Sequence, residues 1–218
     1  MGHLQCLDLE NGRLLWKYRH PWWPPASAVV CERNRVVIAA CNDETLNGID
    51  ADSGKRRWSV PTTGLVRGRP LVRAGKVYAA TEKGHLHCLD TASGELAWTG
   101  RYGRGQWHQF LEGDDTELYV LDAQWHCSAL DLQTGALRWI ARLRSPGCWA
   151  PVRCGRHLVV LSRDGHLAVF DPQEQVKVWE GAIPGTFHQP PAIGEGMLLA
   201  ASSNAGLLAY DIDPFYED

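Results

Sequence analysis

Short apolar runs alternate with polar turns along this chain, and the alternation itself recurs about every 40 residues. Each unit holds four short runs rich in Val, Ile, Leu and Ala, separated by Gly, Asp, Asn or Ser. Runs this short, bounded by turn residues, predict β-strands rather than helices. The second run of each unit spans residues 36–40, 77–81, 118–121, 158–161 and 198–202, and the first run spans 28–30, 70–72, 109–111, 151–153 and 191–193.

The third run of each unit ends at an aspartate that opens a tight turn. These aspartates are Asp8, Asp50, Asp90, Asp131, Asp171 and Asp211, at spacings of 42, 40, 41, 40 and 40 residues. Five copies place a tryptophan eight residues later (Trp16, Trp58, Trp98, Trp139 and Trp179), and four place a glycine four residues later (Gly12, Gly54, Gly94 and Gly135). Glycine supplies the positive φ of a tight hairpin, and aspartate accepts nearby backbone N–H groups. The motif therefore predicts a hairpin whose outgoing strand carries the tryptophan.

Four strands in a unit of about 40 residues are typical of a β-propeller blade. The Asp-x-x-(Ser/Thr)-Gly-x-x-x-Trp hairpin resembles the repeat of the PQQ-like (quinoprotein-type) β-propeller family, and the likeness covers nearly the whole chain. The resemblance implies that each tryptophan and glycine dock neighbouring blades. We therefore expect an all-β protein in which residues 1–218 form a single propeller domain of four-stranded blades.

When the predicted strands are sorted by their position in the unit, the first, second and fourth positions each have five strands and the third position has six. The chain therefore begins and stops in the middle of a blade. The segment 13–18 could supply the missing outer strand beside residues 192–211 and close a five-bladed ring. Residues 4–7 and 207–210 would then compete for one third-strand position. The alternative is that the chain is a piece of a longer propeller.

Composition and charge limit the classes of partner that the protein can bind. The 218 residues carry a net charge of -3 with a pI near 6.3, without the basic footprint of a nucleic-acid-binding protein. No apolar stretch approaches the roughly 20 residues that span a bilayer, and the N-terminus lacks the layout of a signal peptide. These features predict a cytoplasmic protein with neither nucleic-acid nor membrane partners, and a periplasmic location stays open if an upstream signal was removed.

The repeats differ most at positions 22 to 23 residues before each aspartate, just ahead of the innermost strand. Loop entrances do not require Arg, His or Trp, whereas a pocket for a ligand or peptide uses them. The predicted ligand- or partner-binding residues at this channel mouth are Arg67, Trp107, His108, Trp149, His188 and Gln189. The competing interpretation is that these side chains simply fill a narrow channel.

Two further features of the loop side bear on binding. His108, Cys148 and His188 could converge as zinc or copper ligands, although we predict no metal because only geometry could bring them together. The connections 42–45, 82–84, 122–126, 163–165 and 203–206 lie on the same side and include Trp125, so they form a plausible partner surface.

Catalytic motifs are missing from the sequence. It has no nucleophile elbow, phosphate-binding loop, His-Glu-x-x-His or dinucleotide fingerprint. The resemblance to quinoprotein dehydrogenases would imply adjacent cysteines against the quinone and an acidic calcium site, and the chain shows neither pattern. We predict no cofactor and no enzymatic activity, but a non-catalytic scaffold that recognises a protein or small ligand. The alternatives are a degenerate quinoprotein oxidoreductase or a fragment of one, an outer-membrane assembly-type propeller, and the sensor domain of a larger protein.

Overall fold

The structure is a computed structural model that describes residues 3–20, 27–102, 110–122, 124–145 and 149–212. Within these ranges the chain forms twenty-one β-strands. No helix long and apolar enough to cross a bilayer occurs in the part of the chain that is described. The prediction of an all-β fold is therefore confirmed.

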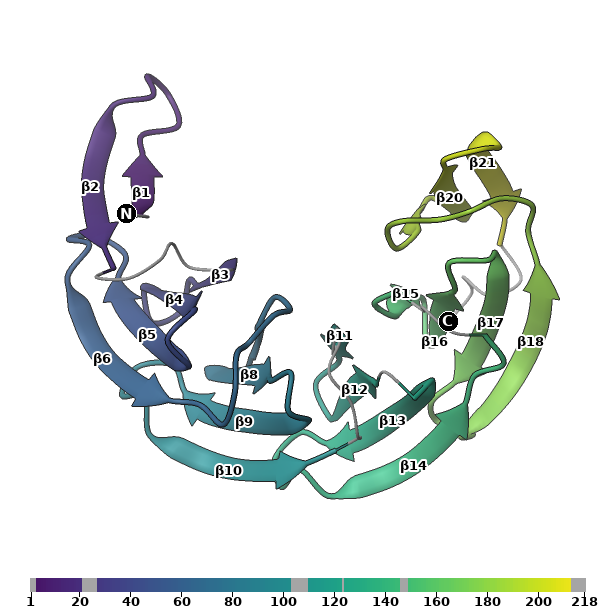
Figure 1. Cartoon of the computed structure of the whole chain (residues 1–218), viewed down its shortest axis with the longest axis horizontal. Helices are drawn as coiled ribbons and strands as arrows, with labels where there is room; N and C mark the ends of the chain where they lie inside the picture. The colour runs from purple at the N-terminus through teal and green to yellow at the C-terminus, as the bar shows by residue number, and fades with distance from the viewer. Residues whose placement is uncertain (1–2, 21–26, 103–109, 123, 146–148, 213–218) are drawn as a thin grey trace. The chain divides into compact units, whose positions relative to one another are not determined.

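The strands form antiparallel sheets in which sequence neighbours pair (Figure 1). The N-terminal pair contains β1 (His3–Leu7) and β2 (Leu14–Arg19). Sheet I contains β3 (Ser27–Cys31), β4 (Val36–Cys41), β5 (Thr45–Asp50) and β6 (Arg56–Pro61); sheet II contains β7 (Leu71–Arg73), β8 (Lys76–Ala80), β9 (His85–Asp90) and β10 (Leu96–Arg101). Sheet III contains β11 (Phe110–Gly113), β12 (Glu117–Leu121), β13 (His126–Asp131) and β14 (Leu137–Arg142); sheet IV contains β15 (Val152–Cys154), β16 (His157–Leu161), β17 (His166–Asp171) and β18 (Val176–Ala182). The C-terminal sheet contains β19 (Ala192–Gly194), β20 (Met197–Ser202) and β21 (Gly206–Asp211).

The chain divides into two compact units, residues 1–115 and 116–218. The first holds the N-terminal pair and sheets I and II. The second holds β12–β14, sheet IV and the C-terminal sheet. That residues 1–218 form one domain stays a prediction.

The repeat aspartate builds the hairpin between the third and fourth strands. In sheet I, Asp50 Oδ1 accepts the N–H of Ser53 at 2.7 Å, and the Asp50 carbonyl accepts the N–H of Gly54 at 2.9 Å. Gly54 has φ 69°, a left-handed conformation that costs a glycine little. The same bonds recur at Asp90 and Asp131, so local turn chemistry explains the periodic motif.

The second strands of sheets I to IV are buried on both faces, which explains their continuous apolar runs, whereas β20 of the C-terminal sheet alternates buried and exposed residues. In β4, Val36, Ile38 and Ala40 pack in a core shared with sheet II. The alternate residues Val37, Ala39 and Cys41 pack in a core shared with the N-terminal pair. Successive side chains of a strand point to opposite faces, so each such strand contributes to two cores.

The segment 13–18, predicted to close the C-terminal sheet, forms β2 and pairs within the first unit, and closure stays a prediction. In the first unit, β2 pairs with β1, with Leu4 opposite Tyr18 and Cys6 opposite Trp16. In the second unit, β21 is the last strand of a three-stranded sheet. A hairpin joined by a short turn closes at lower entropic cost than a pairing between distant segments, so β1 takes the contested third-strand position beside β2. The five-bladed ring is not confirmed, and the number of blades stays a prediction.

Candidate functional site

The structure describes four of the six predicted binding residues. Arg67 lies in the first unit, where its Nε donates to Glu82 Oε2 at 3.1 Å. Trp149 is half-buried in the second unit, and its indole N–H donates to the Phe187 carbonyl at 3.3 Å. His188 and Gln189 follow the fully buried Phe187 and are exposed. Trp149 therefore lies against the segment that leads into His188.

The remaining predicted positions, Trp107 and His108, lie outside the described residues, as does Cys148. Two of the three residues of the alternative metal site (His108, Cys148 and His188) therefore lie outside the described residues. The binding role of Arg67, Trp149, His188 and Gln189 stays a prediction.

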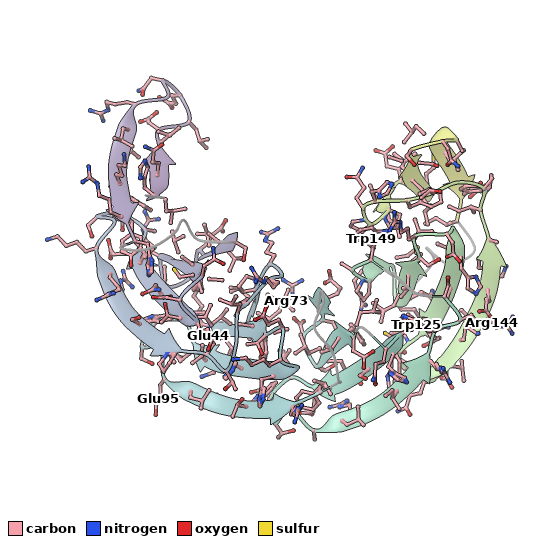
Figure 2. The ribbon with its side chains drawn as sticks, in the orientation of Figure 1. Glu44, Arg73, Glu95, Trp125, Arg144 and Trp149 are labelled. Carbon is pink, nitrogen blue, oxygen red and sulfur yellow. The ribbon has the colours of Figure 1, made fainter. Side chains whose placement is uncertain are left out.

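A pocket of about 460 Å³ opens in the second unit, between the β12–β13 connection and the end of β14. Its lining residues are Gln124, Trp125, His126 and Arg142. Figure 2 labels Trp125 in this connection and Trp149 near β15, and Trp149 is not among the lining residues. The connection 122–126, which holds Gln124, Trp125 and His126, was expected from the sequence to belong to a partner surface, whereas Arg142 was not singled out.

Trp125 occupies a backbone position that the repeat uses four times. Six residues before the aspartate, the chain turns left-handed at Glu44, Gly84, Trp125 and Gly165, with φ of 60°, 82°, 67° and 87°. In each case the carbonyl of this residue accepts the N–H of a residue just after the fourth strand, at distances of 2.7 to 2.9 Å. The turn is thus a constant device that ties the third strand to the end of the fourth.

Only one of these four residues is a bulky aromatic. Glycine adopts the left-handed region freely, whereas a large side chain there costs roughly 1–2 kcal/mol. Strain of this kind persists where the surroundings over-determine it and often marks a binding site. Trp125 therefore stands at a position where stability alone favours glycine, beside the described pocket.

Polar groups around the indole have fixed directions. Asp122 Oδ1 accepts the N–H groups of Gln124 and His126, both at 2.9 Å, and Asp122 Oδ2 lies 3.2 Å from His126 Nδ1. His126 is the cross-strand partner of Arg142. Within the described part of the chain Arg142 makes no ion pair, so its guanidinium is available to an anion.

An aromatic surface, a guanidinium, an imidazole and an amide around one pocket are groups that can recognise a ligand. The indole offers apolar contact area, and the guanidinium forms charge-assisted bonds with a carboxylate. The site lacks a nucleophile next to a base among its described lining residues, as an acyl- or phosphoryl-transfer site would need. These groups suit a ligand that carries a carboxylate beside an apolar group.

Four-stranded antiparallel sheets that each carry the Asp–Trp hairpin, three of them with its glycine, define the chain as a β-propeller-type protein of PQQ-like repeats. A family model described as "Outer membrane protein assembly factor BamB" matches residues 1–147 and 126–214. The chain therefore belongs to this family of BamB-like PQQ repeats. The resemblance stated from the hairpin motif is confirmed.

Curated relatives agree with the family. An outer membrane protein assembly factor BamB of Alkalilimnicola ehrlichii is 30% identical and is matched over 84% of this chain and 50% of that protein. The BamB of Legionella pneumophila is 24% identical over 95% of this chain and 45% of that protein. The chain thus spans about half the length of the curated relatives it matches. The crystal structure of BamB from Moraxella catarrhalis shares the fold, with a TM-score of 0.76 over 92% of this chain and 62% of that chain at 21% identity.

Weaker matches are to enzymes. A tetrathionate hydrolase of Acidithiobacillus ferrooxidans and a quinohemoprotein alcohol dehydrogenase of Pseudomonas putida match 44% and 43% of this chain. The relatives thus include assembly factors and enzymes, with the better matches to assembly factors. Among the functions weighed from the sequence, the comparisons favour the outer-membrane assembly alternative over the unspecified binding module.

The prediction of a cytoplasmic location is wrong. The relatives matched over most of this chain are assembly factors of the outer membrane, which lies beyond the cytoplasm, and they point to the periplasm. The prediction relied on the absence of a signal-like segment in the first residues, and such an absence is weak evidence beside the identity of the relatives.

Proposed function

We propose that this chain acts in the periplasm as a non-catalytic scaffold for outer membrane protein assembly. The proposed binding element is the Trp125 pocket, lined by Gln124, Trp125, His126 and Arg142, and its occupant is an extended acidic segment of a protein partner. The family match supports the assembly role. The observation that carries the site is a tryptophan held left-handed where two other repeats have glycine.

A quinoprotein-type enzyme has less support. The enzyme matches cover less than half of the chain, and the sequence lacks the adjacent cysteines that a likeness to quinoprotein dehydrogenases implies. Binding without chemistry agrees with the pocket, whose cation and aromatic ring recognise carboxylates and apolar groups.

The site is tested by photo-crosslinking in the native host, with the full reading frame expressed and a photoreactive phenylalanine at position 124. We expect a cross-link to a component of the outer membrane assembly machinery. The same label at Gln133, an exposed residue in the β13–β14 turn, serves as the position control. Equal yields of one product from both positions, or no product from position 124, would contradict the proposal.

A pair of matched variants separates binding from folding. Trp125→Gly gives sheet III the glycine that sheets II and IV have at the equivalent positions, Gly84 and Gly165. Glu44→Gly makes the same change in sheet I and leaves the pocket residues unaltered. Both variants should stay folded, because glycine relieves about 1 kcal/mol of left-handed strain. Cross-linking from position 124 should fall at least five-fold in Trp125→Gly and stay unchanged in Glu44→Gly. An undiminished yield in Trp125→Gly would rule out the pocket as the binding element.

A further inference from the structure

Two departures from the repeat meet at the junction between the N-terminal pair and sheet I. The first is Cys41, nine residues before Asp50. The other units have Thr81, Asp122, Ser162 and Ser202 at this position. In three of them the side-chain oxygen accepts the backbone N–H four residues later, at 2.8 to 3.2 Å. Sheet I alone replaces this oxygen by sulfur.

The second departure is His20, four residues after Trp16. The corresponding residues of the other units are Thr62, Tyr102, Leu143 and Ile183. Thr62, Leu143 and Ile183 are buried, so this position normally closes a core. His20 is only 4% exposed and brings an imidazole into the same kind of place.

These two side chains meet a third, Asp43. One ligand atom from each of His20, Cys41 and Asp43 lies within 4.8 Å of the other two. His20 Nε2 is 3.2 Å from Asp43 Oδ2. Cys41 is 2% exposed and Asp43 is exposed to solvent, so the group is buried on the cysteine side and accessible from solvent on the aspartate side.

The hydrogen bonding of this group is incomplete. Among the described residues, three buried side-chain nitrogen or oxygen atoms have no partner, and two of them are His20 Nδ1 and Asn47 Oδ1. Asn47 adjoins the group directly, because its Nδ2 donates to Cys41 Sγ at 3.2 Å. Buried polar atoms are rarely left unpaired, and those that are call for a specific explanation such as a bound ion.

We propose that His20, Cys41 and Asp43 bind a divalent transition metal of the zinc class. Imidazole nitrogen, thiolate sulfur and carboxylate oxygen are the ligands zinc takes, at about 2.0–2.3 Å. The thiolate and the carboxylate together neutralise the two positive charges of the ion. Three protein ligands leave a fourth position for water at the solvent-facing side, where Asp43 lies.

Without the metal, Cys41 is a neutral thiol. Burial raises the pKa of this thiol to about 11, although the hydrogen bond from Asn47 acts in the opposite direction and lowers the pKa. Metal binding displaces the thiol proton, and the Asn47 amide then donates to the thiolate and orients it.

The site would join two sheets. His20 directly follows β2, whereas Cys41 ends β4 and Asp43 lies in the β4–β5 connection. A metal held by all three therefore ties the end of the N-terminal pair to sheet I, where Leu4, Trp16 and Tyr18 already pack against Val37 and Ala39. This role is independent of the partner-binding pocket in the second unit.

The test is titration of the reduced, metal-free chain with Co²⁺ and Zn²⁺. We expect one equivalent of Co²⁺ to give a thiolate-to-cobalt band in the near ultraviolet and Zn²⁺ to displace it. Cys41→Ser should abolish the band and weaken Zn²⁺ binding at least ten-fold. This variant should fold, because serine occupies the same repeat position as Ser162 and Ser202. Its circular dichroism spectrum checks that it does.

Cys88→Ala is the matched control. Cys88 is also buried in the first unit, and the equivalent residue in sheet III is Ala129. The control should keep both the band and the affinity. No thiolate band in the parent chain, or equal Zn²⁺ affinity in Cys41→Ser, overturns the site.

Hydrogen exchange tests the joining role. Zn²⁺ should slow amide exchange in residues 3–20 of the parent chain at least ten-fold and leave it unchanged in Cys41→Ser. Zinc binding without slower exchange in this segment would overturn the joining role while keeping the site.

Discussion

The Trp-bearing junctions differ between the two units. In the first unit, Trp58 packs on Gly94, and its indole N–H donates to the Thr91 carbonyl at 3.1 Å. In the second unit, Trp139 stacks on Phe170 with ring centroids 6.2 Å apart, and its buried indole N–H has no partner. The residue equivalent to Gly94 in the receiving hairpin is Gln175, at φ 58°.

The difference follows from one missing glycine. A β-carbon at Gly94 would lie 2.6 Å from Trp58 Cδ2, closer than real contacts allow. Gln175 has such a carbon, so a tryptophan cannot lie over this hairpin as Trp58 lies over Gly94. The repeat glycine thus serves two purposes. It permits the left-handed turn, and it makes room for the indole ring, whose N–H donates to the carbonyl of the residue after the repeat aspartate.

Gly94→Ala should have the largest effect on this comparison. The new methyl group combines left-handed strain with overpacking against Trp58, and should lower the free energy of unfolding by about 3 kcal/mol. Denaturant titration measures it. Gly12→Ala is the control, because Gly12 has φ 71° but nothing within 4 Å of its would-be β-carbon. The control should lose only about 1 kcal/mol, and equal losses would show that ring docking contributes nothing.

Replacing Trp58 or Trp139 by phenylalanine should lower the free energy of unfolding by amounts that differ by the contribution of one hydrogen bond. Trp58→Phe leaves the buried Thr91 carbonyl without the indole donor, whereas Trp139→Phe removes an N–H that has no partner. The loss of unfolding free energy should therefore be about 1 kcal/mol greater for Trp58→Phe. A larger loss for Trp139→Phe would contradict the difference seen between the junctions.

Gln175→Gly should have the smallest effect and the opposite sign. It removes the left-handed strain and gives Trp139 room, so the protein should gain about 1 kcal/mol in thermal or denaturant unfolding. Gln175→Ala keeps the β-carbon and should show no gain. If both variants behave alike, the β-carbon is not what distinguishes this hairpin.

Most of the fold could be predicted because its signals are local. Asp50, Gly54 and Trp58 lie within nine residues, and turn chemistry together with alternating burial is enough to place the strands around them. The sequence left the third-strand partner of β2 open, since two segments suited that position and only chain connectivity favours β1.

The candidate site was visible from the sequence only in part. Trp125 could be placed in a loop, yet its left-handed backbone emerges only when it is compared with Gly84 and Gly165 in the same register. Arg142 lies seventeen residues after Trp125 and reaches the pocket through the pairing of β13 with β14.

Period, strand count, turn type and the family are properties of residues close together in the chain, and they can be obtained from the amino-acid order alone. The meeting of His20 with Cys41, and of Trp139 with Phe170, belongs to the packing of one sheet on the next. Such contacts depend on which face of a strand is covered and on which sheet covers it. Patterns of residues close together in the sequence do not specify contacts between residues far apart in the chain. The departures from the repeat can be found in the sequence, but only the tertiary structure decided which of them meet in space, and the proposed metal site lies where two of them do.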